Sequence, residues 1–196
     1  TYFFNFDKLT QWIDMAHRCG IEYFELAHFY TQWGARHAPK IMATVDGSYK
    51  KIFGWKTRAN SRKYKEFLTA LSVELKEYLE KRNLRNKVFI HVSDEPNKAM
   101  HRSYKKASMH IHSLFEGYKI VDALSDYSFY EKKIVSNPIP ATDHIDKFIG
   151  KVDNLWTYYC SAQKSHNVAN RLFCNDSIRT RVIGYQMFKF NIRGFL

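Results

Sequence analysis

The pattern of apolar and polar positions divides the chain into alternating helices and strands. Four stretches carry apolar residues at three- and four-residue spacing, which predicts amphipathic helices: 7–18, 61–82, 98–116 and 176–190. Short apolar runs predict strands at 21–30, 87–93, 119–126 and 154–162, with a last strand beginning in 192–196. Two shorter helices are expected near 127–133 and 144–152.

The segment 31–60 fits neither periodicity. Gly34, Pro39, Gly47 and Gly54 interrupt it, and its aromatic residues form no helical stripe. We therefore predict a long irregular loop after the first strand.

Strict alternation of strands and helices is typical of a parallel sheet, and apolar residues on both faces of the strands agree with it. A doubly wound open sheet and a (β/α)8 TIM-type barrel both fit. The chain lacks the glycine-rich phosphate loops of nucleotide-binding open sheets. A barrel takes about 250 residues, so a barrel here is an incomplete one. We predict one incomplete α/β domain over residues 1–196.

The composition allows one substantial core, with 45% hydrophobic residues and a net charge of +12. Basic clusters occur at 56–65, 81–87 and 102–106, which leaves nucleic-acid binding as a remote alternative. Because these clusters fall on polar faces and ends of predicted helices, solvated surfaces account for them, and we predict no nucleic-acid partner.

Other features predict little special chemistry. Three distant cysteines form neither a disulfide framework nor a zinc motif, and we predict no cofactor and no metal site. No apolar run reaches the roughly 18 residues that a membrane span needs, so membrane insertion is not predicted. The compartment (cytoplasmic or secreted) and the oligomeric state stay open.

Two acids stand where the strand 87–93 ends. Asp94 and Glu95 are followed by Pro96, which restricts Glu95 to extended geometry, and by Asn97, which can cap a helix. On a regular strand the two side chains would point to opposite faces. They can share a site only where the backbone turns out of the sheet. A helix start favoured by the dipole is the alternative explanation.

Paired carboxylates in an aromatic pocket suggest glycoside hydrolysis. In its ordinary form the two acids stand roughly 5 to 9.5 Å apart, across the scissile bond, and sequence neighbours are poorly placed for that. They suit a substrate-assisted reaction better. There one acid protonates the leaving oxygen, the substrate's 2-acetamido oxygen attacks the anomeric carbon, and the second acid holds the acetamide N–H.

Further candidate substrate-binding residues lie at strand ends and in the long loop: His28, Trp33, Trp55, Asp126, Trp156 and Tyr158. Alternation places Trp156 and Tyr158 on one face, with the Tyr158 hydroxyl available to an acetamido carbonyl. Trp33 and Trp55 can instead belong to the core, and Asp126 can cap the next helix through Ser128. We expect His91 to be a histidine of the barrel interior that its neighbours satisfy.

Four separated blocks carry a family resemblance: "GIEYFELAHFYTQWGA", "KIFGWKTRANSRKYKEFL", "VFIHVSDEP" and the segment from "LWTYYCSAQKSHNVANRLF" to "SIRTRVIGYQMFKFNIRGFL". They resemble glycoside hydrolase family 123, the retaining β-N-acetylgalactosaminidases, and the overlapping domain of unknown function numbered 4091. The resemblance implies a barrel preceded by a β-sandwich, with the first strand here as the barrel's third, so that the chain holds about strands three to seven. Such a fragment alone is expected either to be weakly stable or to associate, and to be poorly active.

The resemblance also implies residue roles. Glu95 would act as general acid and then as base, partly protonated near neutrality. Asp94, ionised, would orient the acetamido group and stabilise the oxazolinium. The substrate would be a glycan with terminal β-linked N-acetylgalactosamine. A non-catalytic carbohydrate-binding barrel and a glycosidase of another sugar remain alternatives.

Overall fold

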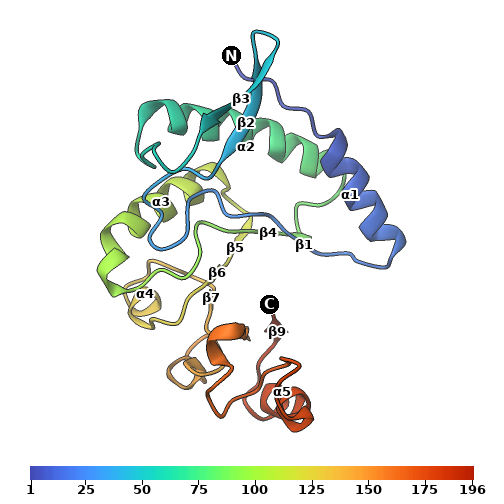
Figure 1. The fold of residues 1–196 in the computed structure, drawn as a ribbon, viewed down its shortest axis with the longest axis vertical. Coiled ribbons are helices and arrows are strands. Elements are labelled where there is room, and N and C mark those ends of the chain that lie inside the picture. Colours follow the sequence, from blue (N-terminus) through green and yellow to red (C-terminus); the bar gives the residue numbers. More distant parts are fainter.

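The protein is described by a computed structural model that covers residues 1–196 and combines helices with parallel strands. Three longer helices lie on one side of the first parallel strands in Figure 1, and the C-terminal elements lie on the other side. The helices are α1 (Asp7–Arg18), α2 (Arg62–Lys81), α3 (His101–Leu114), α4 (Ser128–Glu131) and α5 (Ser177–Lys189). The four long helices agree with the predicted ranges to within three residues at each end.

Two of the expected stretches are less regular than predicted. The stretch 144–152 forms only a 3-10 turn, Ile145–Lys147, and another 3-10 turn, Ser161–Gln163, ends the predicted strand 154–162. A third, Lys98–Met100, precedes α3, and the Asn97 side chain caps it by accepting a hydrogen bond from the Ala99 N–H. Asn97 therefore caps the turn, as its place in the sequence suggested.

The parallel strands are short: β1 (Phe24–Glu25), β4 (Val88–Ile90), β5 (Lys119–Ile120), β6 (Asp122–Ala123), β7 (Pro138–Ile139), β8 (Trp156–Thr157) and β9 (Gly194–Phe195). Parallel pairs join β1 to β4, β4 to β5, β6 to β7 and β8 to β9. A parallel bridge between Ala141 and Tyr158 links the segment after β7 to β8. Spatial neighbours thus follow chain order, and the predicted parallel pairing is confirmed.

The prediction of an irregular loop over 31–60 is wrong for its second half. Strands β2 (Ile41–Val45) and β3 (Ser48–Phe53) form an antiparallel hairpin there. Its two-residue turn is Asp46–Gly47, and both residues have positive φ, 52° and 76°. An Asp-Gly pair supplies this left-handed turn readily, so the turn was readable from the sequence. Strand β7 was also missed, because two residues that include a proline give no periodic signal.

The two faces of β4 have different surroundings. Val88, Ile90 and Val92 are buried in the same hydrophobic core as Leu79 of α2 and Ile111 of α3. The residues between them point to the opposite side, away from the helices, as strand alternation requires. The segment that carries the acid pair is therefore anchored by its helix-facing side.

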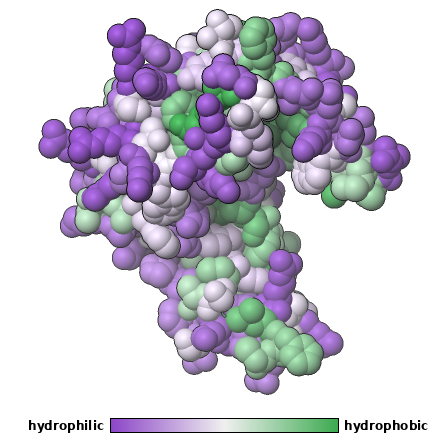
Figure 2. Space-filling view, turned by 45° about the horizontal axis from the view of Figure 1, so that its top comes forward, coloured by the Kyte–Doolittle hydropathy of each residue, from purple (hydrophilic) through white to green (hydrophobic).

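The C-terminal helix α5 packs weakly. None of its residues is buried, and Ile178, Tyr185 and Phe188 are exposed. Figure 2 shows apolar surface at this end of the molecule, at the bottom of the view. No helix in the structure has both the length and the apolar character of a membrane span.

Candidate active site

The acid pair lies in a tight turn beyond the carboxyl end of β4. Glu95 adopts a left-handed conformation with φ of 42°, which is uncommon for a residue with a side chain. The expectation that Pro96 holds Glu95 in extended geometry is therefore wrong, and the turn is made at Glu95 itself. Its N–H donates to the Ala123 carbonyl, and the Asp94 carbonyl accepts from the Trp33 N–H, both at 3.0 Å. The turn is therefore tied on one side to β6 and on the other to the loop after β1. The backbone does turn out of the sheet at the acid pair.

Asp94 has a partner from the loop after β1. The Gln32 side-chain Nε2 donates to Asp94 Oδ2 at 2.8 Å, and both side chains are half-buried. The bond fixes the orientation of this carboxylate. Sequence reasoning missed Gln32, and the only signal for it was its position in a loop predicted at the carboxyl end of the strands.

Glu95 has a different partner. The Tyr158 hydroxyl, just beyond β8, donates to Glu95 Oε1 at 2.5 Å. Burial and the neighbouring Glu95 carboxylate raise the pKa of Tyr158, so its phenol stays protonated and donates. The two acids thus have separate hydrogen-bond partners from separate strands. Tyr158 was predicted for the site, although as a donor to substrate.

Trp156 lies elsewhere on the same strand. Its ring packs edge-on against Phe89, with centroids 5.2 Å apart, and Lys119 Nζ lies 5.0 Å from its ring centroid. The ring also lies so close to Gly194 of β9 that a Cβ there would collide with it. The structure brings Tyr158 to the acid pair and places Trp156 against Phe89 and Gly194.

The two loop tryptophans are exposed to equal degrees, at 57%. Trp33 adjoins the acid pair through its backbone N–H, and its left-handed backbone (φ of 57°) leaves the indole in solvent. Trp55 follows the β2–β3 hairpin, and its indole takes part in no hydrogen bond or ring contact of the structure. Trp33 is therefore the tryptophan that the structure places beside the acids.

The remaining predicted residues have local partners. His28 Nδ1 lies 2.5 Å from the Tyr30 carbonyl. Asp126 Oδ1 accepts from the Ser128 N–H at 3.0 Å and from its hydroxyl at 2.6 Å. Burial opposes ionisation of Asp126, but these bonds outweigh it and hold its pKa below the usual value. Asp126 thus caps the start of α4, the alternative that its sequence position also suggested.

Beneath the acid pair, Asp122 supports the segment that leads to it. Asp122 is 1% exposed, and its Oδ1 accepts from the N–H groups of Val92 and Ser93 at 2.9 and 3.3 Å. Its Oδ2 accepts from the buried hydroxyl of Tyr104 on α3. Burial raises the pKa of Asp122, although His91 and Tyr104 act in the opposite direction. Sequence reasoning missed this aspartate within an apolar strand.

His91 is buried between two carboxylates, but its Nε2 has no hydrogen-bond partner, so it is not the fully satisfied interior histidine that we expected. Its Nε2 lies 3.0 Å from Glu25 Oε1, without the alignment of a hydrogen bond, and its Nδ1 lies 3.5 Å from Asp122 Oδ1. Burial disfavours the charged ring, but the two carboxylates outweigh it and raise the pKa of His91 to about 9. His91 in turn holds the pKa of Glu25 below its usual value.

This pairing predicts a pH-dependent stability. The folded pKa of His91, about 9, exceeds its ordinary value of 6.5, so its contribution is complete below pH 6.5 and is lost as the pH rises through 9. We expect the charged His91 to contribute about 2 kcal/mol to the free energy of unfolding. This value is reduced from the full pKa difference because Glu25 is half exposed and water screens the pair. Urea unfolding of wild type and His91→Gln between pH 6 and 10 measures it. Parallel profiles of the two proteins would contradict the assignment.

No group of three or more His, Cys, Asp or Glu side chains is arranged to hold a metal ion. The site is built from carboxylates, an amide and a phenol.

Comparison with known proteins adds to this geometry. The family model described as "Glycoside hydrolase 123, catalytic domain" matches residues 1–196. No curated protein matches the chain. A solved structure of a family 123 glycoside hydrolase from Clostridium perfringens, studied for glycolipid glycan hydrolysis, is similar, with a TM-score of 0.67 and 16% identity. The match covers 100% of this chain and 35% of that one, so the chain spans about a third of that protein's length.

Proposed function

The chain belongs to glycoside hydrolase family 123, and from this premise we propose that it carries the reacting residues of a glycoside hydrolase. The proposed reaction removes terminal β-linked N-acetylgalactosamine with retention, through a substrate-assisted oxazolinium intermediate. The observation that supports it most is the adjacent acid pair in which each carboxylate has its own partner, Gln32 for Asp94 and Tyr158 for Glu95.

We further propose that the parallel strands are about strands three to seven of a (β/α)8 barrel. Spatial neighbours follow chain order, as barrel staves do. The acid pair then lies at the carboxyl ends of the strands, where barrel enzymes place their reacting groups.

In the proposed reaction Glu95 transfers the protons and the acetamido group of the substrate is the nucleophile. Protonated Glu95 gives its proton to the glycosidic oxygen while the substrate's acetamido oxygen attacks the anomeric carbon and the bond to the aglycone breaks. Glu95, now a carboxylate, takes a proton from water, and the resulting hydroxide attacks the same carbon and opens the oxazolinium ring. Two displacements on one carbon give retention.

Asp94 and Tyr158 act on the acetamido group in this proposal. The Asp94 carboxylate, oriented by Gln32, accepts the acetamide N–H and stabilises the positive charge of the oxazolinium. The Tyr158 hydroxyl donates to Glu95 in the free protein. In the complex this hydroxyl would donate to the acetamido carbonyl of the substrate instead.

A panel of three substrates tests the proposal: the 4-nitrophenyl β-glycosides of N-acetylgalactosamine, N-acetylglucosamine and galactose, with the intact protein. We expect release from the N-acetylated sugars and none from the galactoside, because only the former supply the nucleophile. A thiazoline mimic of the bicyclic intermediate should inhibit. Equal release of 4-nitrophenol from the galactoside would contradict substrate assistance. No hydrolysis of any of the three glycosides would favour a carbohydrate-binding role.

A further inference from the structure

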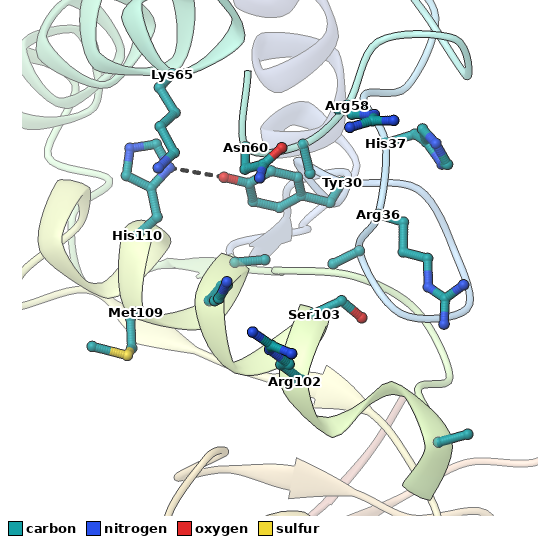
Figure 3. Close-up of a pocket in the computed structure, with 15 residues that line it drawn as sticks. Tyr30, Arg36, His37, Arg58, Asn60, Lys65, Arg102, Ser103, Met109 and His110 are labelled. Atoms are coloured by element: carbon teal, nitrogen blue, oxygen red, sulfur yellow. Dashed lines mark hydrogen bonds between the residues drawn. The ribbon is translucent and has the colours of Figure 1, made fainter. Parts of the chain in front are cut away.

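A basic cavity lies on the helical side of the protein, apart from the acid pair. Its volume is about 840 Å³, and it is bounded by the loop 35–37, the segment 58–60, α2 and α3. Figure 3 shows Arg102 and Ser103 of α3 on the opposite side of Tyr30 from Arg58. Neither acid lines it, nor do their partners Gln32 and Tyr158, so the cavity is independent of the proposed reaction.

The charge of this cavity is of one sign. Five of its lining residues carry permanent positive charge: Arg36, Arg58, Lys65, Arg102 and Lys106. No Asp or Glu lines it, and none of these five side chains takes part in a salt bridge. Neighbouring Arg62, by contrast, pairs with Glu66 at 2.7 Å. The basic clusters of the sequence are thus not only solvated helix faces, because part of them gathers around one hollow.

The inner surface of the cavity is polar and is held in place by a hydrogen bond. The hydroxyl of Tyr30, which is 1% exposed, lies 2.8 Å from His110 Nδ1 on α3, a bond drawn in Figure 3. Asn60 and Ser103 add an amide and a hydroxyl to the walls. The Ser103 hydroxyl donates to the Met100 carbonyl at 3.1 Å, whereas the Asn60 amide makes no side-chain hydrogen bond within the protein and is available as a donor between the two walls of cations.

We propose that this cavity binds a small polyanion that carries at least two phosphate or sulfate groups. Arginine guanidinium groups match such oxyanions with two parallel hydrogen bonds. Cations on both walls require more than one anionic group to be compensated, and the volume lies in the range of small-molecule sites. Single-stranded nucleic acid fits less well, because its binding relies on exposed aromatic side chains that stack on the bases. Tyr30 is the only Phe, Tyr or Trp that lines the cavity, and it is buried.

Two double variants with the same charge change test the proposal. Lys65→Gln/Lys106→Gln removes one cation from each wall, whereas Lys63→Gln/Lys105→Gln removes exposed lysines of the same two helices that do not line the cavity. Calorimetric titration at about 0.15 M salt, where long-range attraction is screened, uses tripolyphosphate and 4,6-disulfated N-acetylgalactosamine as probes. Thermal unfolding of each variant checks its fold.

We expect the wild type to bind at least one probe, and the cavity variant to bind it about tenfold more weakly or worse. The control variant should stay within about twofold of the wild type. Tighter binding of tripolyphosphate identifies polyphosphates as the ligand class, and tighter binding of the sulfated sugar identifies sulfate esters. No binding of either probe at millimolar concentration, or equal losses in the two double variants, would overturn the proposal.

Discussion

Replacing Glu95 with glutamine is expected to lower the kcat of the proposed reaction on N-acetylgalactosaminides by about a thousandfold, within the usual range for loss of a general acid and base. The amide has the shape of the carboxyl group and can still accept the Tyr158 hydroxyl bond, so the turn should keep its structure. It can neither give a proton to the leaving oxygen nor take one from water. Steady-state kinetics on the 4-nitrophenyl substrate measures the loss.

The leaving group separates this role from a structural one. An activated 2,4-dinitrophenyl glycoside needs little protonation, so Glu95→Gln should lose much less in its first step there than on a methyl glycoside. Asp94→Asn should lose activity equally on both, because its proposed role does not involve the leaving oxygen. Asp153→Asn, at an exposed position, is the control. Equal losses of Glu95→Gln on the two leaving groups would contradict the acid assignment.

The helices were predictable because their apolar spacing extends over several turns. The boundaries of α1, Asp7–Arg18, match the sequence prediction, since a strong stripe begins and ends with polar residues there. The parallel strands other than β7 were predicted in the right places but too long. Each parallel strand has only two or three paired residues, because an apolar run indicates burial, whereas regular pairing also needs a neighbouring strand of the same length.

The site was predictable only in part, and the reason is distance along the chain. Asp94 and Glu95 stand at the end of one strand, so a local pattern was enough to name them as candidates. Gln32 lies 62 residues before Asp94, and Tyr158 lies 63 residues after Glu95. No local pattern encodes such pairings, which follow from the order of the parallel strands.

Asp122 lies within an apolar strand, so no local pattern predicts its supporting role. Of the substitutions considered, its removal should lower the stability most. We expect Asp122→Ala to lower the free energy of unfolding by about 4 kcal/mol, because it leaves several buried polar groups without a partner. These are the N–H groups of Val92 and Ser93 and the Tyr104 hydroxyl, besides the charged ring of His91 that lies beside them. Urea unfolding at pH 6, where His91 is charged, measures the loss.

Asp122→Asn keeps the shape of the side chain. It can therefore be measured even if the alanine variant does not fold. Its amide oxygen can accept the two backbone N–H groups, so we expect about half of the alanine loss. Because these two N–H groups directly precede Asp94, even the folded asparagine variant should lose activity, with the loss in kcat. Asp153→Ala, an exposed aspartate, should change neither quantity. Full stability of Asp122→Ala would show that the chain satisfies these groups in another way, and full activity of Asp122→Asn would separate the acid pair from its support.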